Sequence, residues 1–234
     1  LVENDAIFNH GHKRYTIDWY AFLIDRYYTS KDSYDNFDDN KENNILFPLH
    51  FEPEATLLYF KPDLSEQNAV IRSILKYIPS NYTLFIKEHP QQPGALMRPE
   101  YFNIRSNNSN IKFIPAEYDS VLALESSEIV ITICSSVGFE ALIKNKPLIV
   151  LGNVYYDQHP DVYKLQHISE LIEVFKVQPL KSSQDNNTVE FILKMFRFMG
   201  KGDPEKISLN FDNAIVQDVA ESLSEVVKMK FNKI

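Results

Sequence analysis

The segment IVITICSSVGFEALIKNKPLIVLG, residues 129–152, carries the pattern that decides the fold. Its β-branched run from Ile129 to Ile133 predicts a buried strand, Phe139 to Ile143 predicts a short helix, and Pro147 to Leu151 predicts a second strand. Short strands that are apolar throughout, and do not alternate with polar residues, are typical of a parallel sheet covered on both faces. The segment therefore predicts an α/β fold.

The same alternation of short apolar runs and helical segments begins near residue 45. A segment opening at Ser65 repeats apolar residues at helical spacing and ends at Pro79, which predicts one βαβ unit. The whole pattern predicts a Rossmann-like, doubly wound parallel sheet. The other expected strands are Ile45–Leu49, Thr83–Lys87 and Ile111–Ile114, and the other expected helices are Asp119–Ser126, Ile168–Phe175, Val189–Phe198 and Asn213–Met229.

Residues 1–44 differ in kind from residues 45–234, and we expect a domain boundary between them. Residues 15–28 are rich in aromatic side chains and predict a helix, whereas residues 30–44 form an Asp/Asn/Lys-rich stretch that is typical of a surface linker. The aromatic helix could cover a neighbouring domain or pack on its own. Because the chain opens on Leu1 without a leader, we expect it to be a piece of a longer protein.

Composition excludes several classes of function. A formal net charge of -8, with no run of Lys or Arg, argues against a nucleic-acid partner. The single cysteine, Cys134, excludes an intrachain disulfide and a multi-cysteine zinc site. The apolar stretches are far shorter than the roughly 20 residues that span a bilayer. These features favour a globular domain of a reducing compartment.

Polar residues follow the predicted strands. Ligands of open parallel sheets bind beyond the carboxyl ends of the strands, so these residues are the candidates for a site. They include histidines, a lysine, hydroxyls and carboxylates. The stretches are Leu49-His50-Phe51-Glu52-Pro53-Glu54, Lys87-Glu88-His89-Pro90, Pro115-Ala116-Glu117-Tyr118-Asp119-Ser120 and Cys134-Ser135-Ser136-Val137-Gly138-Phe139-Glu140.

The loop after the fourth strand has the clearest chemistry. Ser135, Ser136 and Gly138 would place hydroxyls and backbone N–H groups at the start of a helix, which suits a phosphate. The alternative is that one serine only caps the helix and Gly138 only permits packing. Neither G-x-G-x-x-G nor G-x-x-x-x-G-K-[ST] occurs, which argues against dinucleotide and P-loop sites.

His89 is the second candidate. An imidazole at a strand end can donate to a phosphate oxygen or, when protonated, neutralise charge on a departing phosphate. Lys87 beside it is either a phosphate ligand or a salt-bridge partner. Glu52 and Glu54 could supply an acid/base pair, although residues two apart on an extended loop face opposite ways, so at most one would face a cleft. Cys134 ends an apolar strand without a nucleophile-elbow motif and is expected to be a small buried residue.

The order of these motifs resembles the capsule polysaccharide biosynthesis family over roughly residues 45–165. The residues that carry the resemblance are Phe47 to Glu54, Lys87-Glu88-His89-Pro90, Asp119-Ser120, Thr132 to Leu142, Lys146 to Gly152 and Tyr155-Tyr156. That family includes bacterial Kdo transferases, and the His-Pro and Ser-Ser pairs also resemble those of sialyl- and polysialyltransferases. The resemblance implies the C-terminal half of a GT-B fold, which holds most of the sugar nucleotide.

The resemblance also implies roles for individual residues. His89 would contact the donor phosphate, and Ser135 and Ser136 would bind it from the opposite loop. Many relatives have glycine where Ser135 stands, and this difference weakens the case for a direct role of that serine. No metal or other cofactor is expected, and no Asp-x-Asp pair stands at a strand end. Supporting or nucleotide-side roles would fall to Lys87, Glu88, Tyr118 and Glu140.

The expected function is that of a metal-independent glycosyltransferase of bacterial capsule assembly that uses a nucleotide-activated sugar, expected to be a CMP-linked, Kdo-like donor. The expected partners are a glycan or glycolipid acceptor, a missing N-terminal GT-B half and capsule-assembly proteins. The expected location is cytoplasmic, including the inner face of the plasma membrane. The alternatives are a nonhydrolysing UDP-sugar 2-epimerase and a noncatalytic capsule-assembly module.

Overall fold

The computed structural model describes residues 33–37, 42–52, 62–177, 180, 182, 185–196 and 221. It divides the chain into two units, Leu1–Ser183 and Gln184–Ile234. Within the second unit, helix α8 spans Asp185–Phe196. The aromatic helix expected in residues 15–28 lies outside the described residues, as does nearly all of the helix expected at Asn213–Met229. The domain boundary at residues 44/45 stays a prediction.

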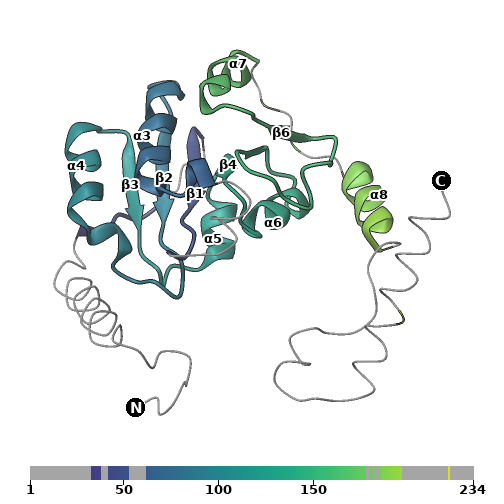
Figure 1. The fold of residues 1–234 in the computed structure, drawn as a ribbon, viewed down its shortest axis with the longest axis horizontal. Coiled ribbons are helices and arrows are strands. Elements are labelled where there is room, and N and C mark those ends of the chain that lie inside the picture. Colours follow the sequence, from purple (N-terminus) through teal and green to yellow (C-terminus); the bar gives the residue numbers. More distant parts are fainter. Residues whose placement is uncertain are drawn as a thin grey trace, which may run out of the picture. The chain divides into compact units, whose positions relative to one another are not determined.

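The first unit contains a six-stranded sheet in the order β3-β2-β1-β4-β5-β6, and every neighbouring pair is parallel (Figure 1). This is the doubly wound Rossmann-like order, so the predicted α/β class is confirmed. The strands are β1 (Asn44–Pro48), β2 (Thr83–Lys87), β3 (Ile111–Ile114), β4 (Ile129–Thr132), β5 (Leu148–Val150) and β6 (Val162–Lys164).

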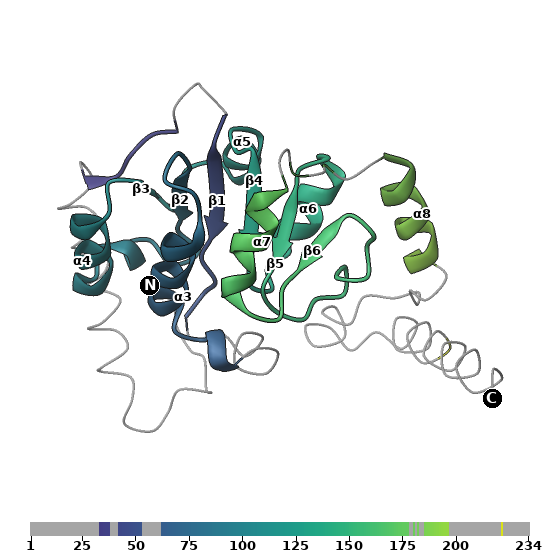
Figure 2. The same ribbon diagram turned by 90° about the horizontal axis from the view of Figure 1, so that it is seen from above.

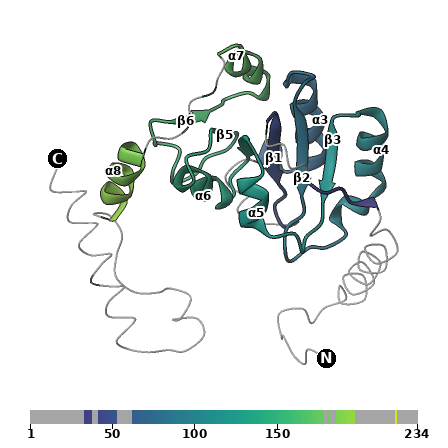
Figure 3. The same ribbon diagram turned by 180° about the vertical axis from the view of Figure 1, so that it is seen from behind.

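Helices cover both faces of this sheet because right-handed crossovers run outward in both directions from its centre. Helices α3 (Gln67–Tyr77) and α4 (Pro99–Asn107) lie on one face, and α5 (Ser120–Glu125) and α6 (Val137–Ile143) lie on the other (Figures 2 and 3). Helix α7 (Leu171–Lys176) packs against α3. Three short 3₁₀ turns join these elements: η3 (Pro62–Leu64), η4 (Ala95–Met97) and η5 (Ile168–Glu170).

The central strands are buried on both faces. All five residues of β1 are buried, and Ile71 and Ile74 of α3 pack on the sheet with no exposed surface. Burying an aliphatic side chain of this size contributes about 1.5–3 kcal/mol. The carboxyl ends of β1 and β4 are therefore held by a rigid core.

The segment 33–37 lies along β3. The Asp35 backbone N–H donates to the Phe113 carbonyl (2.7 Å), and the Phe113 N–H donates to the Asp35 carboxylate (2.8 Å). Ion pairs from Arg105 (3.0 Å) and Lys112 (3.6 Å) hold the same carboxylate. Phe37 stacks on Phe85 of β2, with ring centroids 4.3 Å apart. This segment, which we call the β3 strap, brings residues before β1 to the edge of the sheet.

Two elements differ from the sequence expectation. Helix α4 was not predicted because its apolar residues do not gather on one face, and only Tyr101 and Ile104 of the helix are buried. Strand β6 was not predicted because it is a half-buried edge strand without an apolar run. Within the described residues, no helix has the length and apolar character needed to cross a membrane.

Candidate functional site

The candidate site lies where β1 and β4 meet at the middle of the sheet. These strands are neighbours, yet the connections that leave them run to opposite sides, with α3 after β1 and α6 after β4. In such sheets the two loops separate at this point and leave a crevice where ligands bind. The crevice is framed by the residues after β1, which begin at Leu49, and by those after β4, which begin at Ile133.

Ser135 and Ser136, which follow β4, play different parts. The Ser135 N–H donates to Thr132 Oγ1 (3.1 Å), and Ser135 Oγ accepts from the Val137 N–H (3.2 Å), so the Ser135 hydroxyl shapes the turn into α6. Ser136 is exposed, and among the described residues its hydroxyl has no hydrogen-bond partner. Of the two predicted phosphate ligands, Ser136 is the more exposed, whereas Ser135 already accepts a hydrogen bond within the turn.

Gly138 lies against a buried tyrosine. Tyr156 has no exposed surface, and its hydroxyl donates to the Ser135 carbonyl. A Cβ on Gly138 would overlap that hydroxyl and stand 2.8 Å from Cζ of the ring. The absence of a side chain at Gly138 therefore leaves room for Tyr156, whose hydrogen bond to the Ser135 carbonyl holds the serine loop in place. Burial raises the pKa of Tyr156, so its hydroxyl stays a neutral donor.

His50 joins the two loops across the crevice. Its ring is buried, and Nε2 accepts from the Cys134 N–H (3.3 Å) and lies 3.8 Å from Cys134 Sγ. The His50 backbone is held by Gln67, whose side-chain amide accepts from the His50 N–H (2.7 Å) and donates to the His50 carbonyl (3.1 Å). Cys134, which was expected to be a small buried residue, is half-buried.

His50 stands among the residues that follow the predicted strands, but no role was predicted for it. Its position directly after a strand was the only signal, and the importance of that position depends on the strand order.

Glu52 is held by three side chains. Its carboxylate forms an ion pair with Arg98 (2.9 Å) and accepts from Gln67 (2.7 Å), while Gln92 bonds both its backbone N–H and its carbonyl. These contacts make Glu52 a fixed part of the loop after β1. Glu54 lies outside the described residues, so an acid/base role for this pair stays a prediction.

After β2, Lys87 and Glu88 are buried side chains that organise the loop. Lys87 Nζ donates to the carbonyls of Glu88 (3.2 Å) and Ala116 (3.4 Å), and burial lowers its pKa. The Glu88 carboxylate accepts from the Tyr34 hydroxyl of the β3 strap (2.7 Å). It also accepts from the backbone N–H groups of Gly94 (3.1 Å) and Leu96 (2.7 Å).

Burial raises the pKa of Glu88, and these three hydrogen bonds oppose the shift. Lys87 and Glu88 therefore support the loop that carries His89.

His89 is half-buried at the end of this loop. Its Nδ1 accepts from the Gln91 N–H (3.2 Å), so the proton of the neutral ring sits on Nε2, which can donate. Phe51 packs against the ring with centroids 5.8 Å apart in a T-shaped arrangement. His89 and Ser136 thus come from β2 and β4, the two neighbours of β1, whose ends lie about 10 Å apart. A ligand that contacts both would cross the end of β1.

Tyr118 and Glu140 are the two remaining predicted site residues. Tyr118, after β3, packs against Phe37 of the β3 strap with ring centroids 5.5 Å apart. Glu140 lies in the first turn of α6. Partial burial and the charge of Glu140 raise the pKa of Tyr155, a residue that is 59% exposed. No group of three or more potential metal ligands occurs among the described side chains.

The sequence of residues 9–163 matches the family model described as "Capsule polysaccharide biosynthesis protein". The chain belongs to this family.

The chain is also similar to one curated protein and to several solved structures. The capsule polysaccharide export protein KpsS of Escherichia coli is 36% identical over 93 residues, which cover 38% of this chain and 24% of KpsS. Among solved structures, the Thermosulfurimonas dismutans KpsC beta Kdo 2,7 transferase is 19% identical with a TM-score of 0.43, and covers 76% of this chain and 61% of that chain. The UDP-GlcNAc 2-epimerase of Methanocaldococcus jannaschii is 16% identical with a TM-score of 0.46, and covers 79% and 53%.

The capsule-family chain thus spans a quarter to about three fifths of the length of the relatives it matches. The resemblance stated from its motifs is confirmed at the level of the family. The roles of its individual site residues stay predictions, now with a described environment for each of them except Glu54.

Proposed function

We propose that this chain is the donor-binding part of a glycosyltransferase of bacterial capsule assembly, and that the donor is a CMP-linked, Kdo-like sugar. Membership in the capsule polysaccharide biosynthesis family is the observation that carries the proposal. Two features of the geometry support it: an imidazole that presents an Nε2 donor and an exposed serine hydroxyl, on the loops that flank β1.

In the proposed reaction, the bond between the anomeric carbon and the donor phosphate breaks, and a bond from that carbon to an acceptor hydroxyl forms. Nε2–H of His89 and the hydroxyl of Ser136 would donate to phosphate oxygens, where negative charge grows as the sugar leaves. The acceptor hydroxyl passes its proton to a base, for which Glu54 is a candidate from the sequence. With His89 and Ser136 as donors to the phosphate, the proposed reaction needs no metal ion there.

Calorimetric titration of CMP and UDP into the chain and its variants tests the proposal. We expect CMP to bind and His89→Ala and Ser136→Ala each to weaken it by about 10–100-fold, since each removes a hydrogen bond to a charged oxygen. Ser109→Ala, at an exposed serine after α4, is the matched control and should leave the affinity unchanged.

Three outcomes would contradict this proposal in whole or in part. Equal affinity in all variants would overturn the roles of His89 and Ser136. A preference for UDP, together with inversion at C2 of a UDP-sugar, would favour an epimerase. Failure to bind either nucleotide would favour a noncatalytic module.

A further inference from the structure

We propose that a pocket beyond the ends of β5 and β6 is a binding subsite for one sugar ring, which is supplied by the donor or by the acceptor glycan. The pocket has a volume of about 80 Å³. The inference rests on the proposed function in placing a sugar near the crevice, and it adds where that sugar is held. The lining residues are Asp63, Leu64, Leu151, Leu165, Gln166, His167 and Ile168.

The walls of the pocket are built from rigid parts of the fold. The Leu165 N–H donates to the Val150 carbonyl (2.9 Å) and so extends the pairing of β6 with β5. The Glu170 carboxylate accepts from the backbone N–H groups of Gln166 (3.3 Å) and His167 (3.2 Å), which fixes the turn between β6 and η5. The pocket is therefore shaped before any ligand arrives, which lowers the entropy lost on binding.

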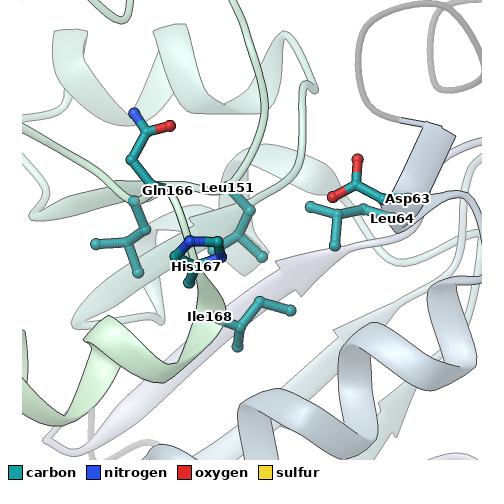
Figure 4. Close-up of a pocket in the computed structure, with 7 residues that line it drawn as sticks. Asp63, Leu64, Leu151, Gln166, His167 and Ile168 are labelled. Atoms are coloured by element: carbon teal, nitrogen blue, oxygen red, sulfur yellow. The ribbon is translucent and has the colours of Figure 1, made fainter.

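The chemistry of the walls suits a sugar. Figure 4 shows Asp63 and Leu64 on one side and Gln166 and His167 on the other. Leu64, Leu151, Leu165 and Ile168 offer aliphatic surface to the C–H groups of a ring. A carboxylate that accepts, an amide that both donates and accepts, and an imidazole match the mixed hydrogen bonding of sugar hydroxyls.

The volume of the pocket and the charge of Asp63 limit which ligands can bind there. A volume of about 80 Å³ is several times that of a single water site and fits one ring rather than a nucleoside. The Asp63 carboxylate would repel a sugar carboxylate at close range. A sugar acid would therefore present its hydroxyl-bearing edge to this pocket and keep its acid group outside.

The position of the pocket agrees with such a role. Its floor residue Leu151 donates its N–H to the Thr132 carbonyl (2.9 Å), at the end of the strand that leads into Ser135 and Ser136. Since β4 and β5 are neighbours about 5 Å apart, the pocket begins one strand away from the serine loop, on the side opposite His89. A phosphate at Ser136 would thus have space for a sugar on one side and for the rest of the donor on the other.

Methyl NMR of the whole chain tests the subsite without relying on activity. Leu64, Leu151, Leu165 and Ile168 carry methyl groups in the pocket, and we expect their resonances to shift on addition of a sugar. The probes are free Kdo, galactose, CMP, freshly prepared CMP-Kdo and a Kdo-terminated oligosaccharide. Shifts with CMP-Kdo but not with CMP assign the pocket to the donor sugar, whereas shifts with the oligosaccharide alone assign it to the acceptor.

Gln166→Ala and Asp63→Asn should each weaken binding of the sugar that shifts these methyls by about tenfold and leave CMP affinity within twofold. The first change removes a hydrogen bond, and the second replaces a charged acceptor by a neutral one. Gln158→Ala is the matched control, since Gln158 is exposed after β5 but does not line the pocket. If no sugar shifts the four residues even at 100-fold the concentration of protein, or if the two variants bind it as wild type does, the subsite is refuted.

The two proposals can fail separately. CMP binding without methyl shifts from any sugar would refute the subsite and leave the donor-binding function standing. Methyl shifts from free sugars without CMP binding would support the subsite and refute the nucleotide donor.

Discussion

Replacing Gly138 by alanine tests how the serine loop is held. The new Cβ would overlap the Tyr156 hydroxyl and lie 2.8 Å from Cζ, so the ring must move. Tyr156 is completely buried, and crowding at such a site costs about 1–3 kcal/mol. Displacement of the ring also breaks its hydrogen bond to the Ser135 carbonyl, which is worth about 1 kcal/mol. We expect Gly138→Ala to lower the free energy of unfolding by about 2–4 kcal/mol.

The assay is urea denaturation monitored by circular dichroism, and CMP affinity is measured in parallel. For a unit of this size the expected loss corresponds to a fall in melting temperature of about 5–15 °C. CMP affinity should fall as well, since Ser136 follows the displaced carbonyl directly.

Tyr156→Phe provides a matched comparison. Alone it should cost about 1 kcal/mol, because it removes the hydroxyl but keeps the ring. Combined with Gly138→Ala it should cost less than the sum of the two single changes, since the hydroxyl that the new Cβ meets is gone. If Gly138→Ala stays within about 0.5 kcal/mol of wild type and binds CMP normally, the packing argument is wrong.

Two further predictions concern charged groups, both measured by unfolding between pH 3 and pH 8. Tyr34→Phe removes one donor from the buried Glu88 carboxylate and raises the pKa of Glu88 further in the folded state. The free energy of unfolding should therefore fall by about 1–2 kcal/mol at pH 8, and by less as the pH falls through the pKa of Glu88. A loss independent of pH would contradict this. Although burial of Asp157 opposes the shift, hydrogen bonds from Lys164 (2.5 Å) and Gln158 hold the pKa of Asp157 below its usual value. Asp157→Asn should therefore cost about 1–2 kcal/mol at pH 7, and the difference should vanish as the pH falls through the lowered pKa; an equal cost at pH 3 would contradict the ion-pair account.

The serine pair shows which features the local sequence pattern predicts and which depend on tertiary contacts. The sequence left open whether the two serines bind a phosphate or cap a helix. In the structure Ser135 Oγ accepts from Val137 and shapes the turn, whereas Ser136 is exposed. The role of Gly138 in the first turn of α6 was equally open, and Tyr156, 18 residues further along the chain, explains it. Neither contact has a signature within the motif itself.

The sequence by itself determined the class of fold and, to within one residue, the ends of the first five strands. Strands β2 and β3 begin and end where the sequence predicted, because a strand covered on both faces is mostly apolar and stands out from its polar neighbours. The family also followed from the order of motifs along the chain.

Only the tertiary structure decided which strand ends meet. The order β3-β2-β1-β4-β5-β6 puts β1 beside β4. The paired residues Leu46 and Val130 are 84 residues apart along the chain, and this pairing places His50 against Cys134. It also pairs Glu52 with Arg98, 46 residues further on, and closes a pocket between η3 and the turn after β6. The physical reason is that local pattern sets whether a segment is a strand or a helix, whereas contacts between distant segments depend on how all of them pack together around one core.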